Sequence, residues 1–178
     1  NKNLRYQGWK ETDLNATGRK QAEKAGEILK GYKPEALFAS DLTRTMETAH
    51  IIGKIVGLSP QKDYRLREIN FGEWEGKTYP EVAELYPEEV KIWRESPLEA
   101  QMPGGETLKN VFERMWEALE DMSAGAKGNV VVVTHGGPIR LFLCHMGAEG
   151  AMWQYPVKPG SITVVENKGG KMTLLGQE

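Results

Sequence analysis

Residues 130–138 read VVVVTHGGP, and this stretch decides the fold. The four valines predict a strand buried on both faces, because continuous β-branched runs without polar alternation are typical of parallel sheets. Pro138 lies where proline favours the start of a helix. We therefore expect a buried strand that ends at Thr134, His135 and Gly136 and leads directly into a helix.

A second junction of the same kind begins at the apolar run Ala36–Ala39. This run predicts a buried strand ending at Ser40, and Asp41 is the expected N-cap of a helix that closes at Gly57. In open parallel sheets, ligands bind beyond the carboxyl ends of the strands. Helix N-termini there offer free N–H groups and a partial positive charge. The two junctions together predict an anion-binding site.

The rest of the chain alternates helical and strand patterns, as is typical of an α/β domain. Apolar spacing predicts a helix from about Thr17 to Gly31, capped by Asn15 or Thr17, and a helix carrying Leu108 to Met122. We further expect a strand-like piece at 61–66, one or two short helices in 78–102, and late strands at 161–166 and 171–175 that form an antiparallel edge. The predicted fold is a three-layer sandwich with a mostly parallel central sheet and helices on both faces, and residues 1–178 form a single domain.

The composition is that of an ordinary globular domain, with 39% hydrophobic and 27% charged residues. A net charge of −2 gives no reason to expect nucleic acid or an anionic membrane as a partner. No apolar run approaches the ~20 residues of a membrane span. The single cysteine, Cys144, fits a reducing compartment, so we expect a cytoplasmic protein, and its apolar neighbours predict that it is buried.

Arg44 is informative because a cation in the first turn of a helix is disfavoured by the helix dipole. Two explanations fit this position. Either Arg44 pairs with a nearby surface acid, or its guanidinium faces an anion held at the strand ends.

His135 also allows two interpretations. A histidine directly after a buried strand can be a hydrogen-bonded core residue. The following Gly136 and Gly137 favour a ligand site instead, because glycines let a ligand approach the backbone closely, and a protonated imidazole there would donate to a phosphoryl oxygen. His50 and His145 lie mid-helix without the spacing of paired ligands, so we expect no metal site.

Glu68 stands in an acidic, glycine-rich stretch, which is compatible with a solvated loop. Its apolar neighbours Ile69, Phe71 and Trp74 favour the alternative. Partial burial by such side chains raises the pKa of a carboxyl toward the range that a general acid needs.

Four motifs occur in order along almost the whole chain. They are SDLTRT at 40–45, REINFGEWEG at 67–76, PGGET at 103–107 and VVVTHG at 131–136. Together with RYQGW at 5–9, they resemble the histidine phosphatase superfamily, also called phosphoglycerate mutase-like. Each motif is short, but the combination is specific.

The resemblance implies a role for each candidate residue. Arg44 and His135 would bind the phosphoryl oxygens, and Glu68 would protonate the leaving alkoxide and then deprotonate the attacking water. The remaining pocket residues that the family implies are Asn1, Gln7, Gly8 and Gly136. The implied reaction passes through a phosphohistidine and requires neither a metal ion nor a cofactor.

The family's Arg-His-Gly motif, which carries the nucleophilic histidine, does not occur in the 178 residues. In the family this motif follows a central first strand. We therefore expect the strand and its motif upstream of Asn1, because the 178 residues alone should not catalyse the phosphohistidine reaction.

Residues 71–76 and 103–107 indicate which branch of the family the chain resembles. They are similar to the short phosphatases, which include the α-ribazole phosphatases of cobalamin synthesis. Residues 77–106 carry only three basic side chains, Lys77, Lys91 and Arg94, which favours a less anionic substrate. Trp93 or Trp74 is suited to pack on a base or sugar, and for Trp93 a plain core position is the alternative. α-Ribazole 5′-phosphate is thus the preferred substrate hypothesis, with a cofactor-dependent phosphoglycerate mutase and a non-catalytic phosphate-binding relative as alternatives. The expected partner is a small phosphorylated metabolite, and a homodimer is left open.

Overall fold

The computed structural model describes residues 4–146, 152 and 155–178. Within these residues, three parallel strands form the central sheet in the order β2-β1-β3, with β1 at Ala36–Ala39, β2 at Gln61–Lys62 and β3 at Val130–Val133. Ala39 pairs with Val133, and the N–H of Ser40 donates to the carbonyl oxygen of Val133 at 2.9 Å. The two junctions predicted from the sequence therefore end side by side at one edge of the sheet.

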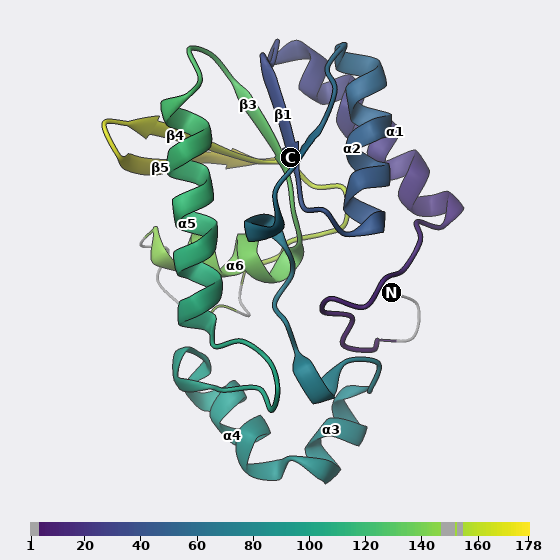
Figure 1. Cartoon of the computed structure of the whole chain (residues 1–178), viewed down its shortest axis with the longest axis vertical. Helices are drawn as coiled ribbons and strands as arrows, with labels where there is room; N and C mark the ends of the chain where they lie inside the picture. Colours follow the sequence, from purple (N-terminus) through teal and green to yellow (C-terminus); the bar gives the residue numbers. More distant parts are fainter. Residues whose placement is uncertain (1–3, 147–151, 153–154) are drawn as a thin grey trace.

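Helices cover both faces of this sheet, which confirms the predicted architecture (Figure 1). Leu37 and Val131 pack on the face covered by α1 (Ala16–Gly31) and α2 (Thr43–Val56). Phe38 and Val132, one residue further along each strand, pack on the opposite face against α5 (Leu108–Ala124). Successive side chains of a strand alternate between faces. The valine run has no polar position because both of its faces are covered.

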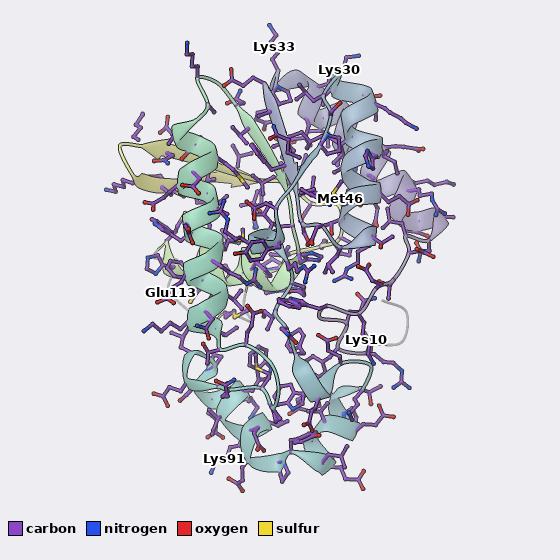
Figure 2. All side chains as sticks on the ribbon, viewed as in Figure 1. Lys10, Lys30, Lys33, Met46, Lys91 and Glu113 are labelled. Carbon is purple, nitrogen blue, oxygen red and sulfur yellow. The ribbon has the colours of Figure 1, made fainter. Side chains whose placement is uncertain are left out.

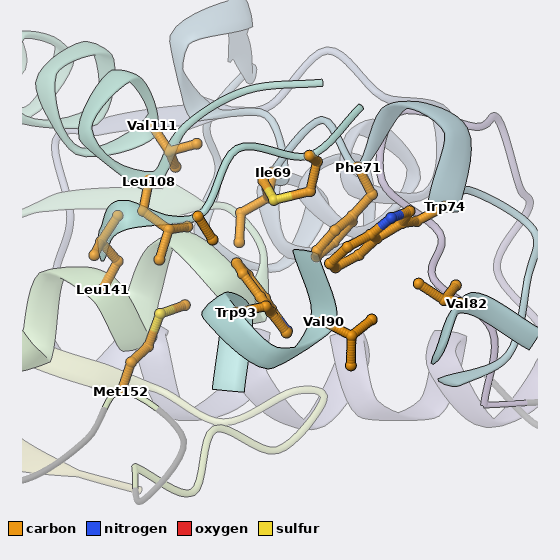
Figure 3. Close-up of a cluster of buried hydrophobic side chains, with 12 residues drawn as sticks. Ile69, Phe71, Trp74, Val82, Val90, Trp93, Leu108, Val111, Leu141 and Met152 are labelled. Atoms are coloured by element: carbon orange, nitrogen blue, oxygen red, sulfur yellow. The ribbon is translucent and has the colours of Figure 1, made fainter. Parts of the chain in front are cut away.

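A smaller helical lobe lies beyond the carboxyl ends of the strands (Figure 1). It contains α3 (Tyr79–Leu85), α4 (Pro87–Glu95) and two single turns of 3-10 helix, η2 (Gly72–Trp74) and η3 (Pro97–Glu99). Its core is aromatic, and the rings of Trp74 and Trp93 meet edge to face with centroids 5.9 Å apart (Figure 3). Both tryptophans are buried, with 0% and 5% of their surface exposed. The core position considered for Trp93 is confirmed, and the prediction that Trp74 or Trp93 packs on a substrate is wrong.

The first two helices begin differently. The side chain of Asn15 accepts from the N–H of Gly18 at 2.8 Å, so α1 is capped as predicted. The N-cap of α2 is Leu42, and the predicted cap Asp41 instead binds Arg67, with each carboxylate oxygen 2.7 Å from a guanidinium nitrogen. A bidentate ion pair is stronger than a single capping hydrogen bond, so the capping prediction was wrong.

The strand-like piece at 61–66 is shorter than predicted. Asp63 accepts from the N–H of Arg65 at 2.8 Å, and this bond bends the chain into the single turn η1 (Tyr64–Leu66). Only Gln61–Lys62 pair with β1. The turn carries the chain toward Glu68 at the carboxyl end of the sheet.

The last two strands, β4 (Thr163–Lys168) and β5 (Lys171–Gln177), form the predicted antiparallel hairpin. Among the described residues they make a sheet of their own, so the prediction that they form an edge of the parallel sheet was wrong. Ile162, directly before β4, packs on the cluster around Leu37 and Val131. The hairpin is therefore attached to the domain through side-chain packing and not through strand pairing with β3.

Charged side chains are spread over the surface: exposed Lys33 and Lys91 lie at opposite ends of the molecule, and exposed Lys10 lies between them (Figure 2). No helix in the described part of the chain is long and apolar enough to cross a membrane. Cys144 on α6 (Gly136–His145) is half-buried, so the prediction of a buried cysteine was wrong. The preceding Leu141–Leu143 take the buried positions of this helix.

Candidate active site

The three principal candidates, Arg44, Glu68 and His135, come together at the carboxyl end of the sheet. Arg44 is the second residue of α2, and its Nη2 atom lies 3.4 Å from Nδ1 of His135. His135 is the N-cap of α6. The N–H of Gly137, in the first turn of that helix, points to Oε2 of Glu68 at 3.4 Å. One cation, one imidazole and one carboxyl group thus share a single cluster, as the sequence predicts.

Arg44 is held by backbone carbonyls and not by an acid. Its Nη2 donates to the carbonyl oxygen of Gly8 at 2.8 Å, and its Nη1 donates to that of Lys10 at 3.0 Å. No carboxylate of the described residues lies within ion-pair distance of the guanidinium, so the surface-pairing explanation is wrong. Burial lowers the pKa of Arg44, while the negative charge of Glu68 raises it. The site therefore holds a partly buried cation whose charge is not neutralised by direct contact.

His135 is buried, with 8% of its surface exposed. Its Nε2 atom lies 2.9 Å from Oγ of Ser40 and 3.4 Å from Oγ1 of Thr45. Burial, followed by the charge of Arg44, lowers the pKa of His135 well below its ordinary value. The lowered pKa favours a neutral imidazole in the unliganded protein, and a protonated His135 beside a bound phosphoryl group stays a prediction. Because Arg44 can only donate, we assign the imidazole proton to Nε2, which donates to Ser40.

Glu68 sits directly against the start of α6. Its Oε1 accepts from the N–H of Ile69 at 3.0 Å, and a Cβ atom added at Gly137 would lie only 2.3 Å from that oxygen. The surrounding protein desolvates the carboxyl group and raises the pKa of Glu68, although part of the residue's surface stays open to solvent. The alternative of a solvated acidic loop is therefore wrong. A raised pKa is what a general acid needs near neutral pH.

The glycines of the site make room for side chains of the protein itself. Because Gly137 has no side chain, there is room beside it, and the carboxyl group of Glu68 occupies this room. Gly8 has φ +54°, and a Cβ there would meet Oε1 of Glu75 at 1.9 Å. At Gly136 the nearest atom to an added Cβ is Nη1 of Arg140 at 3.0 Å, so a second guanidinium lies beside the start of α6.

Of the two remaining predicted pocket residues, Gln7 and Asn1, the structure describes only Gln7. Gln7 is half-buried in the same loop as Gly8, and its carbonyl oxygen accepts from the N–H of Lys10 at 3.1 Å. No described hydrogen bond links its side chain to Arg44, Glu68 or His135. Asn1 lies outside the described residues.

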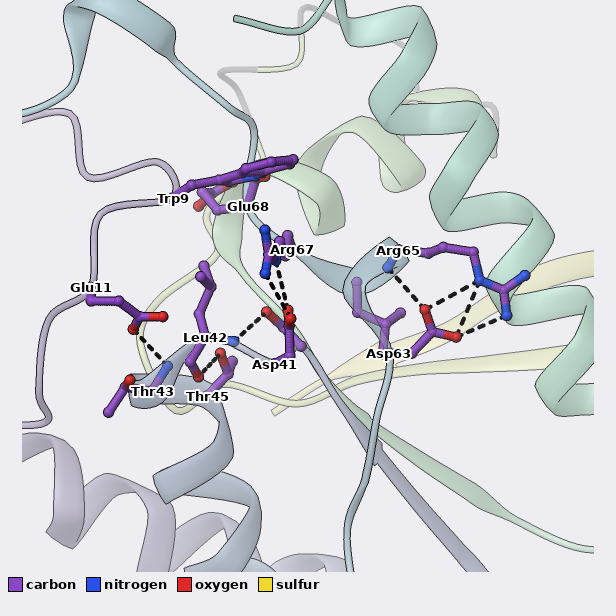
Figure 4. Close-up of polar contacts among 12 residues, drawn as sticks. Trp9, Glu11, Asp41, Leu42, Thr43, Thr45, Asp63, Arg65, Arg67 and Glu68 are labelled. Atoms are coloured by element: carbon purple, nitrogen blue, oxygen red, sulfur yellow. Dashed lines mark hydrogen bonds and ion pairs between the residues drawn. The ribbon is translucent and has the colours of Figure 1, made fainter.

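Sequence reasoning missed the residues that bind the backbone carbonyl of Glu68. The indole N–H of Trp9 donates to the carbonyl oxygen of Glu68 at 2.7 Å, and Nη2 of Arg114 donates to the same oxygen at 2.9 Å. The guanidinium of Arg67 lies 4.7 Å from the centre of the Trp9 ring (Figure 4). The only available signals were that Trp9 lies in the opening motif and that Glu106, the partner of Arg114, lies in PGGET.

The described residues contain no group of three or more histidine, cysteine, aspartate or glutamate side chains that could hold a metal ion. The positive charge at the site comes from Arg44 and Arg140, whose fields both act on Glu68. The arrangement can therefore bind an anion through guanidinium groups and deliver a proton to it.

Known proteins are similar to this chain in sequence and in fold. The family model described as histidine phosphatase superfamily (branch 1) matches residues 1–177. Phosphoserine phosphatase 1 of Hydrogenobacter thermophilus is 32% identical over 174 residues, which cover 96% of this chain and 82% of that protein. The structure of Bacillus stearothermophilus YhfR has a TM-score of 0.89 at 29% identity, with 97% of this chain and 88% of that one covered.

A second solved structure, from Escherichia coli str. K-12 substr. MG1655, is described as a candidate α-ribazole-5′-P phosphatase. Its TM-score is 0.85 at 25% identity, with 98% of this chain and 87% of that chain covered. The motifs, the fold and these similarities agree. The chain therefore belongs to the histidine phosphatase superfamily (branch 1), which confirms the predicted class of phosphoric monoester hydrolase.

Proposed function

We propose that this chain hydrolyses a small phosphomonoester through a phosphohistidine intermediate. The observation that carries the proposal is the position of Arg44 beside Glu68. Arg44 is a partly buried cation without an acidic partner among the described residues, and Glu68 is a carboxyl group of raised pKa within its field. A phosphoryl group bound by Arg44 would therefore face a proton donor.

In the first step, a histidine nitrogen forms a bond to phosphorus while the ester P–O bond breaks. Glu68 transfers its proton to the leaving oxygen. The raised pKa keeps more of Glu68 protonated near neutral pH than an exposed glutamate would be. The alkoxide thus leaves as a neutral alcohol.

In the second step, a water molecule attacks the phosphohistidine, and ionised Glu68 removes its proton while the P–N bond breaks. Inorganic phosphate is the product. Arg44 offsets the charge of the phosphoryl oxygens in both steps. His135 is neutral without ligand, but a bound phosphate dianion would raise its pKa and let it take up a proton.

None of the three histidines of the chain is suited to be the nucleophile. Both ring nitrogens of His135 are engaged, Nε2 with Ser40 at 2.9 Å and Nδ1 facing Arg44 at 3.4 Å. His50 on α2 and His145 at the end of α6 are exposed. We therefore propose that the nucleophile lies in the family's Arg-His-Gly motif, upstream of Asn1.

The sheet offers a place for the strand that precedes that motif. β3 is the last strand in the order β2-β1-β3, so among the described residues its outer edge has no strand partner. Unpaired strand edges within a domain are normally covered. A strand along this edge would end next to His135 and bring its following residues to the site.

The substrate that we favour is α-ribazole 5′-phosphate, and the structural similarity to the candidate α-ribazole-5′-P phosphatase supports it. Two of the three basic side chains of 77–106 already have partners within the protein: Lys77 donates to the carbonyl of Glu73, and Arg94 pairs with Glu95. A strongly anionic substrate would lack these partners. The similarity to phosphoserine phosphatase 1 makes phosphoserine the second candidate.

The test is a panel of phosphomonoesters offered to the protein with its upstream segment. We expect release of inorganic phosphate, with the highest kcat/KM for α-ribazole 5′-phosphate, and slower release from phosphoserine, 3-phosphoglycerate and p-nitrophenyl phosphate. Interconversion of phosphoglycerates without hydrolysis would favour a mutase. Phosphate binding without any turnover would indicate a non-catalytic relative, and either result would overturn the proposal.

A further inference from the structure

The side chain of Trp9 connects the loop that holds Arg44 to the backbone of Glu68. The carbonyl group of Gly8 and the N–H of Trp9 belong to one planar peptide unit. Arg44 donates to this carbonyl at 2.8 Å, and Oε1 of Glu75 accepts from this N–H at 2.7 Å. The backbone of Trp9 is therefore fixed at both ends of its peptide bond.

The indole N–H then reaches across 59 residues of sequence to the carbonyl oxygen of Glu68, at 2.7 Å. Figure 4 shows the Trp9 ring extended across Glu68, with the Arg67 guanidinium below it. Arg114 supplies a second donor to the same oxygen at 2.9 Å, and the ion pair with Glu106 at 2.8 Å holds Arg114. The carbonyl has two lone pairs, and both are thus used.

This carbonyl matters because its peptide unit also contains the N–H of Ile69. That N–H donates to Oε1 of Glu68 itself at 3.0 Å. Rotation of the peptide plane would therefore move the donor that orients the carboxyl group. Trp9 fixes one end of the plane, and the carboxyl of Glu68 is attached to the other end.

We infer that Trp9 is a positioning residue for Glu68, acting through the peptide bond between Glu68 and Ile69. The inference rests on the proposed function, because it assigns Glu68 the proton transfer. Trp9 does not touch the reacting atoms in this scheme. It couples the loop that binds Arg44 to the orientation of the proton donor.

The leaving group provides a readout that a merely structural role would not produce. An alkyl phosphate releases a strongly basic alkoxide and needs the proton of Glu68. p-Nitrophenyl phosphate releases a stabilised phenolate that leaves without protonation. A misplaced Glu68 therefore slows the alkyl ester selectively, whereas a loosened phosphate site slows both.

The experiment compares kcat/KM for phosphoserine and p-nitrophenyl phosphate in the protein with its upstream segment, because kcat/KM reports the steps through the first release of a leaving group. Trp9→Phe removes the indole N–H and keeps an aromatic ring next to the guanidinium of Arg67. Replacement of Trp9 by β-(3-benzothienyl)alanine keeps the bicyclic shape and removes only the donor. Trp116→Phe is the matched control, since the Trp116 ring packs on Phe112, Phe142 and His145.

We expect both replacements of Trp9 to lower kcat/KM for phosphoserine by about fivefold to tenfold, the scale of one hydrogen bond. The value for p-nitrophenyl phosphate should change by less than about twofold, and Trp116→Phe should change neither. An equal loss on both substrates, or no loss on phosphoserine, overturns the inference while the proposed function stands. If the unmodified protein releases phosphate from neither of these esters nor from α-ribazole 5′-phosphate, the proposed function itself fails.

Discussion

The carboxyl group of Glu68 occupies the place where a side chain of residue 137 would begin. An added Cβ on Gly137 would lie 2.3 Å from Oε1 of Glu68 and 2.7 Å from Cδ1 of Ile69. The N–H of Gly137 points to Oε2 of the same carboxyl group at 3.4 Å. The start of α6 thus sets both the room and one hydrogen-bond partner for the proposed proton donor.

Gly137→Ala should therefore displace Glu68. We expect kcat/KM for an alkyl phosphomonoester to fall by about tenfold or more, and the free energy of unfolding to fall by about 1–3 kcal/mol because the buried site is overfilled. The measurements are initial rates and denaturant unfolding. Gly31→Ala at the end of α1 is the control, since nothing lies within 4 Å of its added Cβ. Unchanged rates in Gly137→Ala would show that the position of Glu68 does not matter.

Arg44→Gln should weaken both substrate binding and turnover. Loss of a preorganised charge at a phosphoryl group costs about 100-fold to 1,000-fold in rate, and Arg44→Lys should recover only part of this because a lysine cannot form the forked contacts. Titration with inorganic phosphate and kcat/KM are the measurements. Arg19→Gln, which removes an exposed ion pair with Glu47 on α2, is the matched control. Retention of phosphate affinity in Arg44→Gln would contradict the assignment.

The lowered pKa of His135 predicts how the stability of the protein depends on pH. Its pKa is lowered in the folded protein, so below about pH 6.5 the unfolded chain binds a proton that the folded protein does not. The free energy of unfolding should therefore fall as the pH drops below that value, by at most about 1.4 kcal/mol per pH unit from this group.

Glu68 has the opposite effect on the free energy of unfolding as the pH falls. Its raised pKa lets the folded protein bind a proton more tightly than the unfolded chain. The contribution of His135 is therefore isolated by comparing the unmodified protein with His135→Asn in denaturant titrations from pH 8 to pH 5. The difference in unfolding free energy should shrink as the pH falls. A difference that is constant with pH would show that His135 does not stay neutral.

Asp41→Asn should destabilise the protein and not only the site. The carboxylate of Asp41 accepts two bonds from Arg67 at 2.7 Å, and the two side chains are about a quarter exposed. Loss of the charge should cost about 1–2 kcal/mol of unfolding free energy, allowing for solvent screening. Arg67 lowers the pKa of Asp41, so this stability is present above the unfolded pKa and is lost as the pH falls through the folded pKa. Denaturant unfolding of Asp41→Asn against Asp13→Asn, an exposed position, measures it; equal stabilities would refute it.

The part of the site that the sequence predicts is the part that local pattern and topology determine. The valine run 130–133 leads into His135, and the apolar run 36–39 ends shortly before Arg44. These two patterns suffice to place both residues at one end of a parallel sheet. The ion pair of Asp41 and the lowered pKa of His135 could not be predicted from local pattern, for a common reason. Asp41 finds a stronger partner 26 residues away in Arg67, and the protonation state of His135 depends on burial by segments far along the chain.

The contact between Trp9 and Glu68 also lies beyond pattern reasoning. It joins two irregular loops 59 residues apart, and no periodicity links an indole to a backbone carbonyl. The prediction that Gly137 admits a ligand failed because the protein's own Glu68 fills that place. Spacing shows where a backbone can be approached but not which group approaches it.

The most direct test of the account is the rate of phosphoserine hydrolysis by Glu68→Gln in the protein with its upstream segment. Glutamine keeps the size of the side chain and cannot transfer the proton. We predict a loss of kcat/KM of about 100-fold or more, with the affinity for inorganic phosphate within about threefold of the unmodified protein. Turnover equal to that of the unmodified protein would contradict the assignment of Glu68 as the proton donor, and with it the proposed reaction.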